Sequence, residues 1–265
     1  MRSSEAGLSP IVGAVLVIGI FTGLAVTVYS SYSRAASKGE EGETLTSLLQ
    51  SFLQAKEGME RMENGKTFVL PFKLNVGGKA GGTLWVRPEA GKYGRMGFTP
   101  RGLEIGNLTL VLEGGQLIGQ IGGRAETLSP PTLLRISEVK EENMVRWLRV
   151  EVHHLILENM EFQLASTSPL SLRFTCTSDR YTVIPENGRP NAEKVVVNLE
   201  NWVSPQTKEA WKRALSFLVS LYPPYYGISL HPENLILTVL GFDNTPGFKD
   251  ILYYERYTGI RVEVV

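Results

Sequence analysis

Hydrophobic and polar positions divide the chain into an apolar beginning and a patterned remainder. No charged residue lies between Glu5 and Arg34, and residues 8–29 form one uncharged, mostly apolar run. A helix of that length rises about 33 Å, which is enough to cross the hydrocarbon core of a bilayer. The pattern therefore predicts a transmembrane helix over residues 8–29, with a single pass through the cell membrane.

The start of this apolar run carries helix-initiation signals. Ser9 can cap a helix with its hydroxyl, and Pro10 suits the first helical position, where its missing N–H costs nothing. Within the run, Gly19 and Gly23 form a small-xxx-small pair that permits close helix packing. An ordinary secretory signal has a shorter apolar region that is followed by a small-residue cleavage site, so that class is disfavoured.

A second apolar stripe follows, at intervals of three and four residues, in a segment that is otherwise rich in Glu, Lys and Gln. This spacing predicts an amphipathic continuation of the helix, ending near Asn64-Gly65. We expect one long helix over residues 8–63, whose first part lies in lipid or a filament core and whose second part packs on a folded domain. The stripe consists of Leu45, Leu48, Leu49, Phe52, Leu53, Met59 and Met62.

From Lys66 onward, β-branched or alternating runs are separated by Gly, Pro and Asn, which predicts a head of antiparallel strands over residues 66–265. Gly114-Gly115, between two such runs, gives the strongest hairpin signal. The expected fold class is α+β: a long N-terminal hydrophobic and amphipathic helix, then a mainly antiparallel, sandwich-like β-rich head with a C-terminal helix.

A later section, residues 191–265, reads as strand, helix and strand, so the head is either one domain or includes a separate α+β subunit. Ser204-Pro205 is expected to open its helix, and Pro223-Pro224 to end it. One face of that helix is predicted to be apolar. It consists of Trp211, Leu215, Leu218 and Leu221.

Charge and residue chemistry argue against most catalytic and binding classes. Lys+Arg and Asp+Glu are both 27, so no net field favours nucleic acid. The single cysteine, Cys176, is expected to be a small buried hydrophobe. His153 and His154 are adjacent in a predicted strand, so they face opposite ways, one exposed and one packed, and cannot share a metal. His231 lies in a turn context without ligand-type neighbours.

No nucleophile motif or phosphate-binding glycine loop is present in the sequence, and we predict neither enzymatic activity nor a metal or cofactor. Asn107-Leu108-Thr109 is a possible N-glycosylation site. The tyrosine-rich segments LYPPYYG and ILYYERY suggest either adhesion or sheet packing, and packing is the favoured interpretation.

The short polar leader ending in Ala6-Gly7, followed by LSPIVGAVLVIGIFTGLAVTVY, resembles the class III signal and N-terminal helix of archaeal type IV pilins. The resemblance covers residues 1 to about 33. It implies that a prepilin peptidase removes residues 1–7 by cutting between Gly7 and Leu8. Two departures are the sparse leader charge, with Arg2 as its clear cation, and Val12 where bacterial pilins have glutamate.

The resemblance implies a structural subunit, minor or atypical because of its large head, of a pilus-like surface filament. Its expected partners are other pilin-like subunits through the N-terminal helix, the prepilin peptidase, the pilus assembly machinery and the membrane. The head would lie outside the cell and contact surfaces or partners. The alternative is a signal-anchored extracellular binding protein that does not polymerise. A membrane-tethered hydrolase is a third class, and would require a clustered polar pocket.

Overall fold

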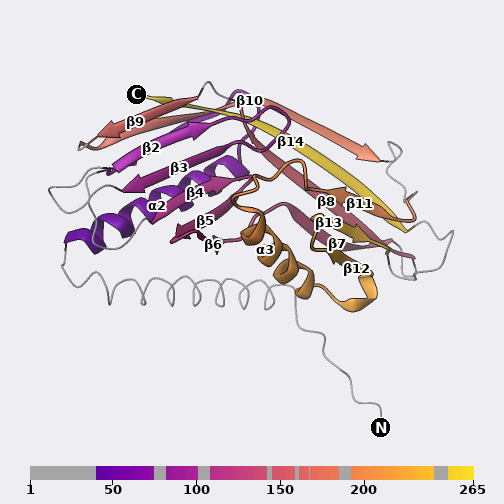
Figure 1. The fold of residues 1–265 in the computed structure, drawn as a ribbon. Helices are drawn as coiled ribbons and strands as arrows, with labels where there is room; N and C mark the ends of the chain where they lie inside the picture. The colour runs from indigo at the N-terminus through magenta and orange to yellow at the C-terminus, as the bar shows by residue number, and fades with distance from the viewer. Residues whose placement is uncertain are drawn as a thin grey trace, which may run out of the picture.

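Three β-sheets and two α-helices make up the part of the chain that the structure, a computed structural model, describes (Figure 1). The strands and helices come from segments that are spread over the whole sequence after residue 39. The described residues are 40–74, 82–100, 108–141, 145–158, 161–166, 168–184, 192–241 and 250–265.

Sheet 1 has five strands in the order β1-β10-β14-β8-β7. Its central pair, β14 and β8, is parallel, and the other neighbours are antiparallel. Parallel strands need a long connection, and here β9 to β13 and α3 lie between β8 and β14 in the sequence. The strands are β1 (Thr67–Phe72), β7 (Leu134–Glu141), β8 (Val145–Leu157), β10 (Leu170–Ile184) and β14 (Ile251–Val264).

Sheet 2 is an antiparallel sheet in the order β6-β5-β4-β3-β2-β9. Gly114 and Gly115 join β4 to β5 with φ of 53° and 79°, which favours glycine at both turn positions. The predicted hairpin is therefore confirmed. The strands are β2 (Gly82–Arg87), β3 (Arg95–Pro100), β4 (Thr109–Glu113), β5 (Gln116–Ile121), β6 (Arg124–Ser129) and β9 (Phe162–Ser166).

Sheet 3 is small, with β11 (Val195–Asn198), β13 (Ile236–Val239) and β12 (Ile228–His231) in that order. Helix α3 (Lys208–Ser220) packs against β6 and β12, and a 3₁₀ turn, η1 (Pro224–Tyr226), follows it. The helix starts three residues after the predicted Pro205 and ends before Pro223, as expected. Of the predicted apolar face, Trp211, Leu215 and Leu218 are buried, whereas Leu221 is 41% exposed and follows the end of α3, so the prediction is wrong for Leu221.

Helix α2 (Glu40–Glu60) contacts strands of both large sheets: β1 and β10 of sheet 1, and β4 and β5 of sheet 2 (Figure 1). The predicted packing of the second apolar stripe on a folded domain is confirmed. Leu48, Phe52, Met59 and Met62 are buried in a core shared with both sheets, and the other stripe residues pack against it.

The predicted fold class is wrong. The described chain is mainly β, and its strands form three sheets rather than a sandwich pair. The predicted long helix over 8–63 is represented in the described part by α2 alone, which ends at Glu60. Alternation of apolar and polar residues indicated where strands lie. Strand order, however, depends on pairing between segments far apart in sequence, such as β14 beside β8. The sequence features Gly7, Leu8, Ser9, Pro10, Gly19 and Gly23 lie outside the described residues.

The predicted membrane localisation also needs correction. Among the residues described, no helix is both long enough and apolar enough to cross a membrane. The prediction of a single-pass transmembrane protein with an extracellular head is contradicted to that extent. Its basis, residues 8–29, lies outside the described residues.

Candidate functional site

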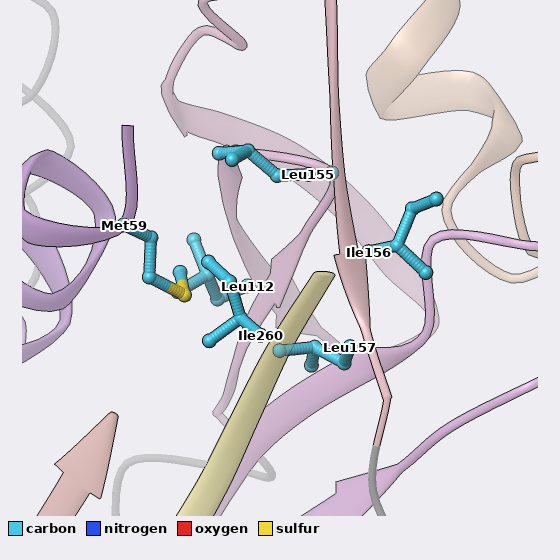
Figure 2. Close-up of a pocket in the computed structure, with 8 residues that line it drawn as sticks. Met59, Leu112, Leu155, Ile156, Leu157 and Ile260 are labelled. Carbon is cyan, nitrogen blue, oxygen red and sulfur yellow. The ribbon is translucent and has the colours of Figure 1, made fainter. Parts of the chain in front are cut away.

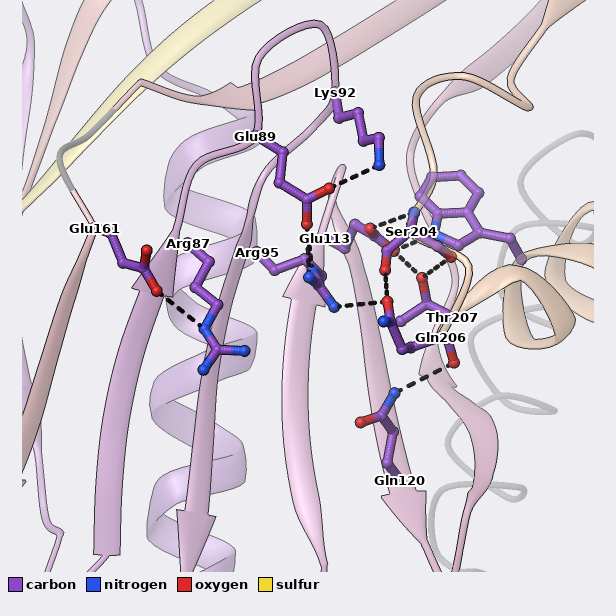
Figure 3. A network of polar contacts seen from close by, with 11 residues as sticks. Arg87, Glu89, Lys92, Arg95, Glu113, Gln120, Glu161, Ser204, Gln206 and Thr207 are labelled. Carbon is purple, nitrogen blue, oxygen red and sulfur yellow. Dashed lines mark hydrogen bonds and ion pairs between the residues drawn. The ribbon is translucent and has the colours of Figure 1, made fainter.

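A buried carboxylate holds the turn before α3 against sheet 2 (Figure 3). Glu113, at the end of β4, is 2% exposed. Its Oε1 accepts the backbone N–H of Ser204 at 2.9 Å, and its Oε2 accepts the Thr207 hydroxyl and the Trp211 indole N–H, the latter at 2.9 Å. Burial raises the pKa of Glu113 against these three donors. The arrangement fixes the start of α3 in the core.

Near Glu113, charged side chains closer to the surface also contact the turn before α3 (Figure 3). Arg95 contacts Glu89 Oε1 through Nε at 3.0 Å and Nη2 at 2.6 Å, and its Nη1 donates to Gln206 Oε1 at 3.2 Å. Lys92 pairs with Glu89 at 2.8 Å. Burial opposes ionisation of Glu89, but these cations outweigh it and lower its pKa. The network ties the turn before α3 to β3.

An aromatic cluster continues inward from Trp211. Tyr93 stacks on Trp211 with ring centroids 5.4 Å apart, and His154 lies on the other side of the cluster at 5.8 Å from Tyr93. His154 also stacks on Trp202 at 5.0 Å and on Tyr257 at 4.7 Å. These five rings come from the β2–β3 loop, β8, the segment before α3, α3 itself and β14, so the cluster joins sheet 1 to α3.

A chain of hydrogen bonds runs through the cluster. The Tyr93 hydroxyl lies 2.9 Å from His154 Nδ1, and His154 Nε2 lies 3.2 Å from Glu255 Oε1. Since an ionised carboxylate only accepts, Nε2 of His154 donates to Glu255, and Nδ1 lies against the Tyr93 hydroxyl. Tyr93 is fully buried, and burial raises its pKa well above the ordinary value. The chain therefore runs from Tyr93 through His154 to Glu255.

Glu255 lies at the solvent end of this chain, with its side chain 23% exposed. Tyr253 and Tyr257, on the same face of β14, also contribute to lowering its pKa. The hydrogen bond from His154 is the main reason that the pKa of Glu255 is lowered, in spite of partial burial. Burial raises the pKa of both tyrosines, so they stay protonated. The arrangement keeps a negative charge at the edge of an aromatic cluster.

Among Tyr93, His154 and Glu255, Glu255 is the one that is partly open to solvent. Tyr93 and His154 are buried, and the Tyr93 hydroxyl hydrogen-bonds to His154 Nδ1. A separate pocket between α2, β8 and β14 is lined by six apolar side chains and two glycines, so it has no polar side chain that would orient a ligand (Figure 2). The lining residues are Met59, Leu112, Gly114, Gly115, Leu155, Ile156, Leu157 and Ile260.

The predicted histidine geometry is confirmed in part. His154 is buried and His153 faces the other side of β8, but His153 is half-buried rather than exposed. Its Nε2 lies 2.8 Å from the Thr258 hydroxyl, and burial, with Arg256 nearby, lowers its pKa to about 4. In the described segments, no group of three or more His, Cys, Asp or Glu could hold a metal ion.

Three further sequence predictions have separate outcomes. Cys176 is 1% exposed and unpaired, so its predicted role as a buried hydrophobe is confirmed. His231 is exposed at the end of β12, which precedes a turn. Asn107 lies outside the described residues, and its glycosylation stays a prediction.

Comparisons with protein-family models, curated proteins and solved structures found no match to this chain. Its site therefore rests on geometry alone. Sequence reasoning missed Glu113, Tyr93, Trp202 and Glu255 because none belongs to a local motif. The tyrosine-rich segment around Tyr257 was the one available signal, and the favoured packing interpretation holds for that residue.

Proposed function

We propose that this chain is a structural, non-catalytic subunit of a type IV pilus-like surface filament, in which the β-rich body contacts partners. The proposal draws on the sequence resemblance over residues 1 to about 33. The observation that carries it is how firmly α2 is built into the body. A filament subunit must transmit load between its N-terminal segment and its head, and α2 is the element that enters the body first.

The apolar face of α2 gives the first part of this attachment. Phe52 is fully buried and meets Phe72 of β1 edge to face, with centroids 5.4 Å apart. Leu48 and Ala55 are also fully buried. Truncating a buried Phe costs about 3–5 kcal/mol, so α2 cannot leave the body without a large loss of stability.

Polar contacts fix the end of α2 to sheet 1. Arg256 of β14 donates through Nη2 to the Met62 carbonyl at 2.7 Å. Its guanidinium also pairs with both carboxylate oxygens of Asp179 on β10, at 2.8 and 2.9 Å. The hydrogen bond from Arg256 is the main cause of the lowered pKa of Asp179. An arginine that pairs with both carboxylate oxygens has a fixed geometry, so the segment after α2 and the strands β14 and β10 would move together.

Polar contacts on the other side of α2 reach the segment around β6. Lys56 is 8% exposed, donates to the Ser129 hydroxyl at 3.0 Å and pairs with Glu60 at 3.4 Å. The Thr132 hydroxyl donates to Glu60. The helix is thus attached on two sides, as expected for a load-bearing element and unnecessary for a simple tether.

The test is the state of the native protein on cells. We expect mass spectrometry to find a mature N-terminus at Leu8, and electron microscopy with labelling to find the protein in filaments. Gly7→Phe should retain the leader and remove the protein from filaments, whereas Ser3→Phe should do neither. Leader-bearing protein in filaments, or a Leu8 start in Gly7→Phe, would contradict the processing step.

A second candidate is an extracellular binding protein that does not polymerise. The Glu255 side chain is partly exposed and lies beside aromatic rings. It favours the binding-protein candidate, because a charged, partly desolvated group suits ligand recognition. Protein that is fully processed or unprocessed, but absent from every filament preparation, would support this alternative over the filament role.

A further inference from the structure

We infer that Tyr222 closes the β7 edge of sheet 1, and that it thereby keeps a second copy of this chain from adding its own β7 there. Strand β7 is the last strand of sheet 1 in the described part of the chain, next to β8. The inference goes beyond the filament proposal and holds equally for a chain that does not polymerise. It rests on two hydrogen bonds to the backbone of β7, on the turn that holds Tyr222 and on the sequence of β7.

The outward backbone groups of an edge strand are a template for strand addition. On the β8 side, the His153 N–H donates to the Leu133 carbonyl at 2.8 Å. Alternate residues of an edge strand turn their N–H and C=O groups away from the neighbouring strand, so those of Leu134 and Ile136 point out of the sheet. Groups of this kind pair readily with a strand of another chain. An uncovered β7 edge would therefore invite such pairing.

The hydroxyl of Tyr222 meets both outward groups. It donates to the Leu134 carbonyl at 3.3 Å and accepts the Ile136 N–H at 3.3 Å, as one residue of an added strand would do. Burial raises the pKa of Tyr222, so the hydroxyl stays protonated and can donate. Tyr222 is half-buried and packs against the core that contains Leu134 and Ile136. Its side chain therefore occupies the place beside β7 that a new strand would need.

The segment that follows Tyr222 holds it at this edge. Two prolines come directly after it, and a proline ring fixes the backbone angle φ. The turn η1 is closed by a hydrogen bond from the Tyr226 N–H to the Pro223 carbonyl at 3.0 Å. The hydroxyls of Tyr225 and Tyr226 donate to Glu138 of β7, at 3.2 and 3.3 Å. The segment thus contacts β7 at several positions and not through one side chain alone.

The opposite edge of sheet 1 is covered in a similar way. The Ser51 hydroxyl of α2 donates to the Pro71 carbonyl of the outer strand β1 at 2.9 Å. Pro71 itself has no N–H to offer to another strand. Both outer strands of this sheet, in the described part of the chain, therefore have a side-chain hydroxyl on an edge carbonyl. Its recurrence at two edges indicates protection against strand addition rather than a chance of packing.

The sequence of β7 makes a second copy of the chain a fitting occupant of an open edge. The strand contains no proline. If two copies of β7 paired antiparallel with Ser137 opposite Ser137, Ile136 would lie opposite Glu138, and Arg135 opposite Val139. No two like charges would then face each other, and such pairs are what destabilises neighbouring strands. This pairing uses the Ile136 N–H that Tyr222 occupies, so the two arrangements exclude each other.

The first test is amide hydrogen exchange in the full chain, kept in detergent micelles because residues 8–29 are apolar. Tyr222→Phe keeps the ring but removes the hydroxyl, so the Ile136 N–H should exchange about fivefold faster. Tyr225→Phe is the matched control, since that exposed tyrosine bonds the Glu138 side chain, and it should leave the exchange of Ile136 unchanged. Unchanged exchange in Tyr222→Phe, or an equal rise in both variants, would overturn the inference.

The second test is covalent capture of a β7–β7 pair. Ser137→Cys places a thiol at an exposed position of β7, and Tyr222→Ala removes the covering ring. Mild oxidation should give several times more covalent dimer in the double variant than in Ser137→Cys alone. Thr182→Cys, at an exposed position of β10, should gain nothing from Tyr222→Ala, and the native Cys176 is buried.

No gain of dimer in the folded double variant, or an equal gain with Thr182→Cys, would contradict the role of β7 as the pairing edge. If Tyr222→Ala does not fold, hydrogen exchange in Tyr222→Phe decides the matter, because that variant keeps the packed ring.

Discussion

Glu113 and Glu255 both contact one aromatic cluster, yet they differ in exposure and in the direction of their pKa shifts. Glu113 accepts three hydrogen bonds, one of them from the Trp211 indole, and Glu255 accepts one from the His154 imidazole. Glu113 is 2% exposed and its pKa is raised, mainly by burial. The Glu255 side chain is 23% exposed and its pKa is lowered, mainly by the His154 hydrogen bond.

The difference shows how access to water decides what a carboxylate can do. At Glu113 every donor belongs to the protein, and removing one partner would leave buried groups unpaired. At Glu255 the side chain is partly open to water. The first arrangement fixes the fold, whereas the second leaves a carboxylate partly exposed with a lowered pKa.

The largest expected effect is the loss of stability when the buried Glu113 is replaced. Glu113→Ala leaves the Ser204 N–H, the Thr207 hydroxyl and the Trp211 N–H without their acceptor, and should lower the free energy of unfolding by about 3–4 kcal/mol. Urea denaturation measures this. Glu126→Ala, which removes an exposed ion pair with Arg213, should cost below about 0.5 kcal/mol. Equal losses in the two variants would show that Glu113 is not structurally special.

Removing the hydrogen bond between Tyr93 and His154 should lower the free energy of unfolding less than Glu113→Ala does. Tyr93→Phe keeps the ring but removes the hydroxyl that bonds His154 Nδ1, leaving one buried acceptor unpaired. We expect a loss of about 1–2 kcal/mol in unfolding free energy by the same assay. Tyr181→Phe, at a 53% exposed tyrosine, is the matched control and should be near neutral. A neutral Tyr93→Phe would mean that water satisfies His154.

At the partly exposed Glu255, the substitution Glu255→Gln should have a small effect on stability. The amide oxygen still accepts the His154 N–H, and water reaches the site, so we expect a loss below about 1 kcal/mol. Denaturation at neutral pH gives this value directly. A loss as large as that of Glu113→Ala would place Glu255 among the structural carboxylates and remove the contrast.

The smallest effect is in pH dependence, and the two glutamates should differ in sign. The raised pKa of Glu113 gives a contribution that is full below the unfolded-state pKa and is lost as pH rises through the folded-state pKa. The lowered pKa of Glu255 gives one that is present above the unfolded-state pKa and is lost as pH falls through the folded-state pKa. Below neutral pH, the wild type should therefore gain stability relative to Glu113→Gln and lose it relative to Glu255→Gln. Drift in the same direction for both pairs would refute the assignment.

Local chemistry made part of this fold predictable. The β4–β5 hairpin follows from two glycines between alternating runs, and α3 from its apolar spacing and the prolines after it. The buried face of α2 was readable in the same way, because period and burial are linked within one element. These features depend on residues that are neighbours in sequence.

The sheet order and the site could not be read in that way. The aromatic cluster brings together Tyr93, His154, Trp202 and Tyr257, whose only common feature is their position after folding. That position depends on β14 lying parallel to β8, a pairing of distant segments that no local pattern specifies. The tyrosines of β14 hinted at a cluster, but the sequence did not indicate which carboxylate they would surround.

The central claim is that burial raises the pKa of one carboxylate of the cluster, while the hydrogen bond from His154 lowers the pKa of the other, which is partly exposed. Carbon-detected nuclear magnetic resonance titration of the glutamate side chains, assigned with Glu113→Gln and Glu255→Gln, measures both pKa values in one sample. The account predicts that Glu113 titrates above the ordinary glutamate pKa and Glu255 below it. The reverse order, or two ordinary values, would contradict it.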